Sequence, residues 1–197
     1  MVKGAIVAFF VISITVYLVD TMESRYPPGI LIPEEPRQTV PSSTNSWKAG
    51  KYQITPLAAF HLRARVLHTE PYWFDHGADL SPVDLALGWG RMSDQSVLDQ
   101  ISFSQGQRWF HYWPRESRFP IPVDEINSHS ANMHMIPANQ SVKGLLKSLH
   151  AGNLIELNGE LVEADGEDGF KWRSSLSRTD TGAGACELVW VEEISAK

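Results

Sequence analysis

Several features that would reveal a function directly are missing from this sequence. Among its 197 residues there is one cysteine, Cys186, so no internal disulfide can form and packing alone must stabilise the fold. Closely spaced cysteine pairs, an HExxH sequence and an EF-hand loop, which mark the common metal sites, do not occur. No segment repeats at a fixed period, which argues against a solenoid or a propeller.

Clusters of basic residues are missing as well. The formal net charge is -6 and the isoelectric point is near 5.6. A protein that binds nucleic acid needs clustered Lys and Arg side chains to displace the counterions of the phosphates. The composition therefore argues against nucleic acid as a partner.

Hydrophobic residues, by contrast, are plentiful. They make up 43% of the chain and charged residues make up 20%, which are the proportions of a globular protein. A chain of 197 residues is long enough for one domain with a substantial core. Its seven tryptophans indicate an aromatic core or an aromatic contact surface, and the core is the more common place for them.

A long apolar run lies near the N-terminus. Residues 4–19 read GAIVAFFVISITVYLV and carry no charge. As a helix they would extend about 24 Å, and the flanking residues bring the length close to the roughly 30 Å of a hydrocarbon core. Three interpretations compete: an uncleaved membrane anchor, a cleaved signal peptide and a buried core helix. The run has no polar face and no small-residue cleavage pattern follows it, which favours the anchor.

The chain is therefore expected to have three parts. Residues 1–22 are predicted to form a single transmembrane helix that contacts the membrane through residues 4–19. Lys3 precedes the apolar run and acidic residues follow it, so the N-terminus is expected on the cytoplasmic side. Residues 23–51 are rich in proline and predict a linker or an arm, and residues 52–197 are expected to form the globular domain.

One apolar patch lies inside the proline-rich segment. Residues 29–32 read GILI, between prolines on both sides. Such a patch is suited to docking on the domain or on the membrane surface. Docking would make this segment an ordered arm rather than a free tether.

The pattern of the remaining residues predicts a β-rich α+β fold with short helices. Strands are expected at residues 60–69, 108–113 and 187–194, and a hairpin-like pair around Gly159. Helices are expected at residues 81–87, 93–101, 123–126 and 140–150. The first two helices would flank a tight turn at residues 88–90 that presents an indole. Glycine within the strand pattern suits a partly open β-barrel.

A candidate metal site involves Asp75, His76 and His134. Asp75 and His76 belong to the segment WFDHGADLSPVD, which also contains Asp79 and Asp84. Carboxylates and imidazoles at close spacing can bind a divalent ion. Acidic residues before a helix are, however, more often caps. The sequence indicates no other cofactor.

A candidate catalytic pair consists of Cys186 and His134. A cysteine nucleophile needs a nearby base, and His134 or His129, both in SHSANMH, would supply an imidazole. The alternative is that Cys186 is a small buried residue of a strand, since free cysteine is among the most buried residue types. The histidines are likewise more often hydrogen-bonded structural residues than ligands or bases.

Three strings have the character of a family signature: DLALGWG from Asp84, SANMHMIPAN at residues 130–139 and SSLSRTDTGAGACE at residues 174–187. They resemble an uncharacterised family of bacterial hypothetical proteins with one N-terminal membrane segment. The resemblance would cover most of residues 60–193 and implies no activity, ligand or catalytic residue. It favours a bacterial inner-membrane location with the globular domain in the periplasm.

The function predicted from these features is that of a membrane-anchored extracytoplasmic domain, an interaction or accessory subunit without enzymatic activity. Trp73, Trp89 and Trp113 are the predicted contact residues, because interface cores are enriched in aromatic side chains. A protein partner or a homo-oligomer is expected. The first alternative is a small envelope hydrolase that uses Cys186 and His134 or the metal site. The second is a self-assembling structural module that pairs through strand edges.

Overall fold

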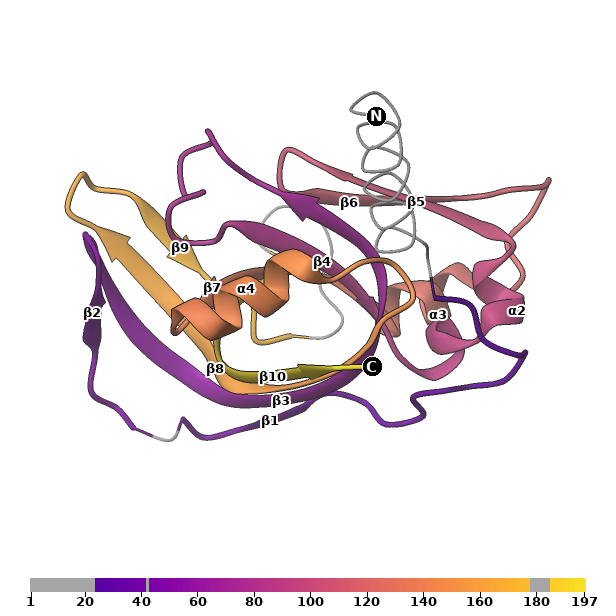
Figure 1. The fold of residues 1–197 in the computed structure, drawn as a ribbon, viewed down its shortest axis with the longest axis horizontal. Helices are drawn as coiled ribbons and strands as arrows, with labels where there is room; N and C mark the ends of the chain where they lie inside the picture. Colours follow the sequence, from indigo (N-terminus) through magenta and orange to yellow (C-terminus); the bar gives the residue numbers. More distant parts are fainter. Residues whose placement is uncertain (1–23, 42, 178–184) are drawn as a thin grey trace, which may run out of the picture.

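The computed structural model describes residues 24–41, 43–177 and 185–197, which Figure 1 draws in colour. The transmembrane helix predicted at residues 1–22 lies outside these residues. Within them, none of the helices has both the length and the apolar character needed to cross a membrane.

Five strands form a closed β-barrel (Figure 1). They are β3 (Tyr52–Pro71), β4 (Val83–Gly88), β7 (Ser130–Pro137), β8 (Leu154–Gly166) and β10 (Glu187–Ala196). Hydrogen bonds join them in the order β3, β4, β7, β10 and β8, and β8 pairs back with β3 to close the barrel. Only β7 and β10 run parallel. This arrangement is that of the OB-fold, a five-stranded Greek-key barrel, and the predicted β-rich α+β class is confirmed.

Apolar side chains that alternate along the strands fill the barrel. On β3 the side chains of Phe60, Leu62 and Ala64 are buried, which confirms the strand predicted at residues 60–69 and its two-residue period as far as residue 64. Residues 64–67 are all buried, and an irregularity in the pairing with β4 follows Val66, so the period breaks there. The other strands contribute inward residues to the same core, among them Leu85, Leu87, Met133, Met135, Leu157 and Val189.

Helix α4 (Gln140–Ser148) connects β7 to β8 and packs against this core. The side-chain oxygen of Asn139 accepts the N–H of Val142 at 3.0 Å and so caps the first turn. Val142 and Leu146 join the apolar cluster of the barrel. The helix predicted at residues 140–150 is confirmed.

The helix predicted at residues 81–87 is wrong, because these residues form most of β4. Ser81 and Pro82 have the sequence of a helix start, yet β4 pairs with β3 on one side and β7 on the other. All six of its residues are buried. Burial on both faces of a central strand outweighs a local capping signal.

The hairpin predicted around Gly159 is also wrong, because β8 runs through this position as one strand. A Cβ atom at Gly159 would lie 2.0 Å from the carbonyl oxygen of Trp190 on β10. The glycine therefore permits a close approach of two backbones rather than a turn.

A long insertion, residues 89–129, separates β4 from β7. It contains η1 (Gly90–Ser93), α2 (Gln95–Leu98), β5 (Ile101–Gly106), β6 (Trp109–Pro114) and α3 (Val123–Ser128). Asp94 caps α2, as the sequence predicts, by accepting the N–H of Ser96. A second apolar cluster holds the insertion to the outside of the barrel, and its buried members are Leu67, Ala86, Met92, Val97, Leu98, Ile101, Ile121 and Ile126.

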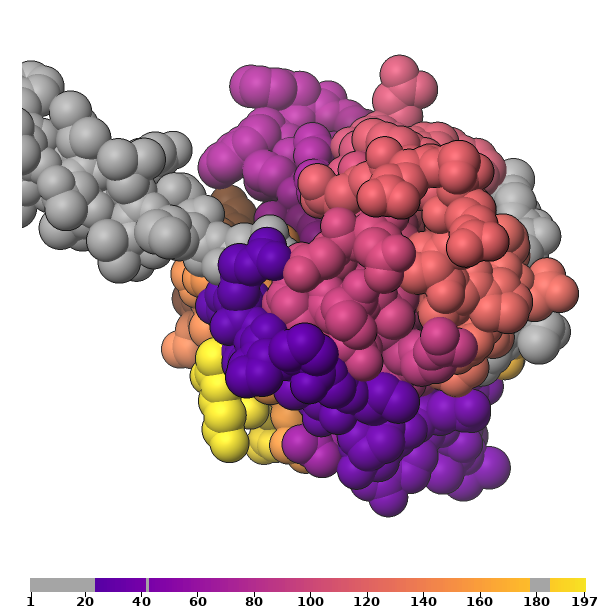
Figure 2. All heavy atoms as spheres, turned by 90° about the vertical axis from the view of Figure 1, so that its right-hand side faces the viewer, coloured from indigo at the N-terminus to yellow at the C-terminus, as the bar shows by residue number. Residues whose placement is uncertain are grey.

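Residues 24–32 dock on this insertion as an ordered arm, which Figure 2 shows in indigo against it. The N–H groups of Leu31 and Ile32 donate to the hydroxyl of Ser93, at 3.1 and 3.0 Å. Gly29 donates to the carboxylate of Asp94 at 3.0 Å. Ile32 itself is buried in the barrel cluster. The second half of the apolar patch, Leu31 and Ile32, thus packs on the domain, while Ile30 is 50% exposed.

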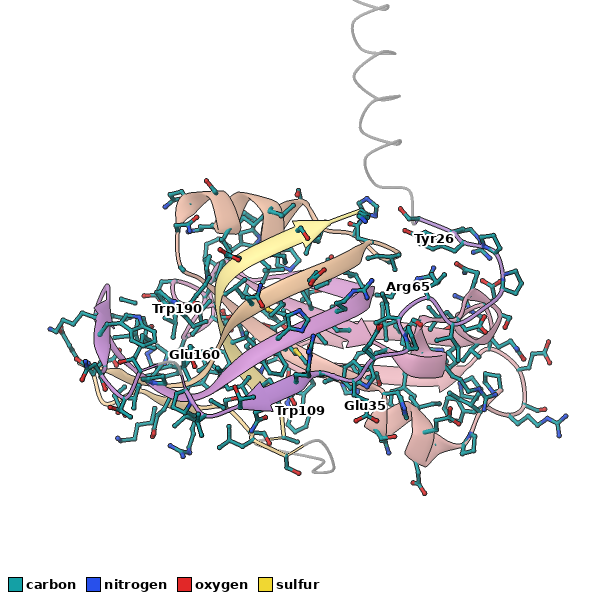
Figure 3. All side chains as sticks on the ribbon, turned by 90° about the horizontal axis from the view of Figure 1, so that it is seen from below. Tyr26, Glu35, Arg65, Trp109, Glu160 and Trp190 are labelled. Atoms are coloured by element: carbon teal, nitrogen blue, oxygen red, sulfur yellow. The ribbon has the colours of Figure 1, made fainter. Side chains whose placement is uncertain are left out.

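A buried arginine lies beneath the start of the arm. Arg65 on β3 donates to the carbonyl of Ser24 at 3.1 Å and to the carbonyl of Ser93 at 3.2 Å. Its guanidinium also lies 5.0 Å from the centre of the Tyr26 ring, and Figure 3 labels both residues. A charge-assisted donor therefore joins the arm to the insertion and the barrel.

The remaining part of the proline-rich segment adds two short strands to the sheet. β1 (Arg37–Thr39) and β2 (Trp47–Ala49) both pair antiparallel with β3. The sequence places the start of the domain at Tyr52. In the described part of the chain, the sheet also includes β1 and β2, which precede this residue.

We expect Ser93→Ala to destabilise the protein by about 1–3 kcal/mol, because two N–H groups of the arm, one buried and one partly buried, lose their acceptor. Chemical denaturation of the full-length protein in detergent measures this change. Ser148→Ala is the matched control, because Ser148 is exposed and its hydroxyl donates only to Leu145 of its own helix. Equal stability of the two variants would contradict the role given to Ser93.

Candidate functional site

A polar cluster lies on the outer face of β4 and β7. Asp84 on β4 is directly opposite His134 on β7. Both point away from the barrel interior, because their neighbours Leu85 and Met133 point into it. The carboxylate Oδ2 of Asp84 lies 2.9 Å from Nδ1 of His134, and the two side chains are 0% and 3% exposed. A buried carboxylate thus meets an imidazole.

Arg108, from the turn between β5 and β6, completes this cluster. Its Nη1 donates to Oδ1 of Asp84 at 2.6 Å. Its Nε and Nη2 donate to the two oxygens of Asp75, at 2.6 and 3.0 Å. Nη2 also donates to the carbonyl of Ser81 at 3.0 Å. One guanidinium therefore joins the insertion, the loop after β3 and the central strand β4.

Aromatic rings cover the charged groups. The guanidinium carbon of Arg108 lies 3.6 Å from the centre of the Tyr72 ring and 5.3 Å from that of Trp172, on β9 (Lys171–Arg173). Trp172 also contacts His134, with ring centres 4.6 Å apart. These contacts exclude water and strengthen the interactions among the charges.

The backbone of the turn that carries Arg108 is strained. Gln107 and Arg108 form a two-residue hairpin turn, and both have positive φ angles, 53° and 69°. Turns of this kind favour Asn-Gly, and a non-glycine residue in this region costs about 1–2 kcal/mol. The side-chain contacts of Arg108 offset the strain, since they require an arginine at this position.

Burial also changes the acidity of Tyr72. Desolvation raises the pKa of its phenol to about 12, and the carboxylate of Asp84 raises it too. The backbone N–H of Arg108, which donates to the phenol oxygen at 2.9 Å, opposes the shift. Tyr72 therefore stays neutral at physiological pH.

A chain of amide groups extends the cluster toward β10. Asn132 on β7 accepts a hydrogen bond from Gln105 at 2.5 Å and donates to the carbonyl of Arg108 at 3.1 Å. Its amide nitrogen lies 3.9 Å from the sulfur of Cys186. On the other side, Gln105 meets the ring of His68 at 3.0 Å. Polar side chains thus line the outer face of β7 from Ser130 to His134, and the apolar Ile136 follows them.

The structure places His134 on β7 and Cys186 just before the neighbouring strand β10. His134 and the Cys186 contact Asn132 are two positions apart on β7 and share its outer face. Cys186 directly precedes β10, which pairs with β7. His134 is nearly fully buried beneath Trp172, which limits the access of a substrate to its ring.

The predicted metal ligands have separate partners. Asp75 is held by Arg108, and His134 by Asp84. His76 is exposed and lies 3.1 Å from Asp168. In the described ranges of the chain, no three His, Cys, Asp or Glu side chains form a group that could hold a metal ion.

The predicted contact tryptophans differ in exposure. Trp89 is 2% exposed and belongs to the core cluster, so its indole is not presented by a turn as the sequence predicts. Its apolar ring fills space between the barrel and the insertion. Trp73 and Trp113 are 65% and 47% exposed and can offer their rings to a partner.

The outer face of the β5–β6 hairpin carries a row of exposed rings, which we call the aromatic row: Trp109, His111 and Trp113 (Trp109 is labelled in Figure 3). Their cross-strand neighbours on β5 are small, namely Gly106, Ser104 and Ser102. The two indoles, four residues apart on one strand, are separated by about 13 Å. Because these neighbours are small, the two indole rings project above the surface of the hairpin. Sequence patterns place residues 108–113 in a strand but give no reason to choose Trp109.

The other face of this hairpin is apolar and packed. Phe110 stacks on Phe103 with ring centres 5.8 Å apart, and Tyr112 contacts Phe119 at 5.6 Å. These four rings pack against the apolar cluster beneath the insertion. Aromatic side chains on β6 thus alternate between two faces: Phe110 and Tyr112 are partly buried on one face, and the aromatic row is exposed on the other.

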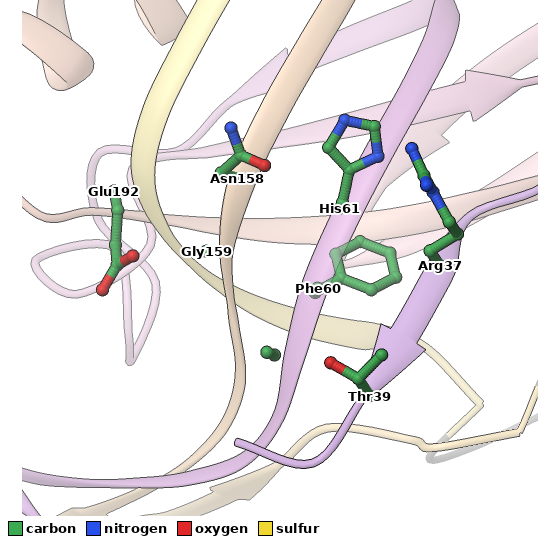
Figure 4. A pocket seen from close by; sticks show the side chains of 8 residues that line it. Arg37, Thr39, Phe60, His61, Asn158, Gly159 and Glu192 are labelled. Atoms are coloured by element: carbon green, nitrogen blue, oxygen red, sulfur yellow. The ribbon is translucent and has the colours of Figure 1, made fainter. Parts of the chain in front are cut away.

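A shallow groove of about 410 Å³ lies on another side of the barrel (Figure 4). Its walls include Arg37 from β1, His61 from β3, Asn158 from β8 and Glu192 from β10. Burial raises the pKa of the Glu192 carboxyl, and neighbouring carboxylates raise it further. Sequence reasoning missed the groove because four distant segments contribute its walls.

We expect Arg108→Ala to destabilise the protein by about 3–5 kcal/mol, because the buried carboxylate of Asp84 loses its cationic partner. Denaturant unfolding measures this change. Arg118→Ala, an exposed position in the same insertion, should change stability by less than about 0.5 kcal/mol. A loss at Arg108 no larger than that at Arg118 would mean that the cluster does not fasten the hairpin.

Tyr72 should be the last of the described tyrosines to ionise. A phenol whose pKa rises on folding, here from 10.0 to about 12, stabilises the fold below pH 10. This contribution disappears as the pH rises from about 10 to about 12. A near-ultraviolet absorbance titration measures the ionisation, and Tyr72→Phe should remove its latest step. Retention of that step in the variant would assign it to another tyrosine.

Comparisons with known proteins identify no relative of this chain. No protein-family model matches the chain, and neither the curated proteins nor the solved structures contain a match. The arrangement of the barrel strands alone does not assign a function, because one fold supports many. The function has to be argued from the residues of this chain.

Proposed function

We propose that this protein is a membrane-tethered binding module without chemistry of its own, and that it binds another protein through the aromatic row. The observation that carries the proposal is the exposure of Trp109 and Trp113, 44% and 47%, on a strand surface with small neighbours. Tryptophan is enriched among the residues that dominate the binding energy of protein interfaces.

The row has the composition of an interface centre. Between the arginines at 108 and 115, β6 has no charged side chain other than a histidine that can protonate. Interface centres are depleted in charged residues and enriched in aromatic ones. The acidic net charge, -6, favours a protein over a nucleic acid.

The polar cluster supports the same proposal by holding the row in one orientation. Arg108 joins the base of the β5–β6 hairpin to the barrel at Asp84 and to the preceding loop at Asp75. A preformed surface loses less conformational entropy on binding than a mobile one. The cluster therefore serves to preorganise the hairpin.

The tether is the apolar run at residues 4–19, whose length and lack of charge suit a membrane anchor. Only residues 20–23 separate it from the docked arm. The location we propose is a bacterial inner membrane, as the family resemblance implies, and the charges that flank the run favour a domain on the periplasmic side.

A photo-crosslinking amino acid in place of His111 tests the proposal in cells that produce the full-length protein. We expect one discrete adduct with another protein, and we expect Trp109→Ala combined with Trp113→Ala to abolish it. Removal of a residue that dominates an interface costs about 2 kcal/mol or more, which weakens binding about thirtyfold. Val40, which is also exposed, is the matched control position for the probe.

The outcomes separate the competing functions. An adduct of twice the monomer mass would show self-assembly through the hairpin and replace the proposed partner with a second copy. The absence of any adduct at position 111, or an adduct that survives loss of both tryptophans, would refute the binding role of the row. Thermal unfolding of the double variant excludes a trivial loss of the fold.

A small hydrolase acting on an envelope substrate is the second candidate. It is favoured by the 2.9 Å contact between Asp84 and His134 and by the position of Cys186 beside Asn132. A cysteine nucleophile works with an imidazole base that a carboxylate orients, and Asp84, His134 and Cys186 supply these three groups on β4, on β7 and just before β10. Cys186→Ala distinguishes the two functions, because a binding module keeps its adduct at position 111 in this variant.

A further inference from the structure

The arm fixes the point at which the N-terminal segment leaves the domain. The N–H of Ser24 donates to the carbonyl of Ala151 at 3.1 Å, and the carbonyl of Ser24 accepts from Arg65 at 3.1 Å. A Cβ atom at Gly152 would lie 2.1 Å from that carbonyl oxygen, so the two backbones are in close contact. Ser24 is therefore held beside the residues that follow α4.

This attachment limits the distance between the domain and the apolar run. Five peptide steps join position 19 to Ser24, and a fully extended chain covers at most about 18 Å over them. The headgroup region on each side of a hydrocarbon core is about 5–8 Å thick. If residues 4–19 lie in a bilayer, Ser24 is therefore within about 18 Å of its hydrocarbon core, which keeps this side of the domain close to the headgroups.

Two consecutive exposed aromatic residues follow β3, and the first of them contacts α4, the helix that ends just before the residues in contact with Ser24. Trp73 and Phe74, at the start of the loop after β3, are 65% and 100% exposed. The ammonium of Lys147, in the last turn of α4, lies 4.4 Å from the centre of the Trp73 ring. Figure 2 shows α4, the start of the arm and this loop on one side of the molecule, toward the left.

The chemistry of this patch fits a lipid surface. A fully exposed phenylalanine next to an exposed tryptophan is unfavourable in water but suits the border between headgroups and acyl chains. Lys147 adds a cation that phosphate groups of lipids attract. The neighbouring carboxylate of Asp75 is paired with Arg108, which reduces its repulsion of those phosphates.

We propose that Trp73 and Phe74 insert into the headgroup region of the bilayer that holds the N-terminal segment, with Lys147 facing the lipid phosphates. This contact rests on the membrane tether of the proposed function but not on the aromatic row. It provides a second attachment of the domain to the membrane. The β5–β6 hairpin is then presented in a fixed orientation relative to the membrane.

The test uses the full-length protein in vesicles of phosphatidylethanolamine and phosphatidylglycerol that contain a lipid with a spin-labelled headgroup. Phe74→Cys, in a Cys186→Ser background, carries an environment-sensitive fluorophore, and Val40→Cys in the same background is the matched control. We expect quenching at position 74 to exceed that at position 40 by about threefold or more, as for a side chain at the interface. Trp73→Ala and Lys147→Gln should each reduce the difference.

Flotation of the vesicles separates this proposal from the tether itself. Protein that floats with the vesicles but shows equal quenching at the two positions would refute the contact while leaving the tether in place. Protein that does not float would overturn both. A probe at position 74 that is shielded in native membranes but not in vesicles would assign the patch to a protein and overturn the lipid contact.

Discussion

The contact between the guanidinium of Arg108 and the buried carboxylate of Asp84 fixes the relative positions of the barrel and its insertion. Asp84 lies on a central strand with no exposed surface, so its charge requires a partner in place. Arg108 supplies that partner from a strained two-residue turn. Buried ion pairs often add little net stability compared with apolar residues. Their value here lies in the unique orientation of the hairpin.

The contacts of Arg108 also cover a face of the barrel that is open to ligands in many OB-folds. OB-folds frequently bind their ligands on the outer face of the second and third barrel strands. In this chain those strands are β4 and β7, and the protein's own Arg108, Gln105 and Trp172 cover their outer face. An external ligand would have to displace these contacts, so the exposed surface of the insertion is the better place to seek a partner.

A second buried arginine plays a comparable role at the other edge of the insertion. Arg65 donates to carbonyl groups of both the arm and η1. If the arm left, the buried guanidinium would lose the carbonyl of Ser24 as an acceptor, which is unfavourable. The apolar Ile32 adds burial to the same junction. The arm, the barrel and the insertion that carries the aromatic row are therefore connected by short-range contacts, so these parts of the domain hold a defined orientation relative to one another.

The sequence by itself determined the local features: the strand at residues 60–69 with its period up to residue 64, the amphipathic α4, the cap of α2 at Asp94 and the fold class. Periodicity and capping are properties of neighbouring residues, so they can be read without contacts. Only the tertiary structure decided that residues 83–88 are a strand, that Trp89 is buried and Trp109 exposed, and that Arg108 meets Asp84. Each of these depends on segments far apart in the chain, whose approach is set by packing and by the pairing of buried polar groups rather than by local preference.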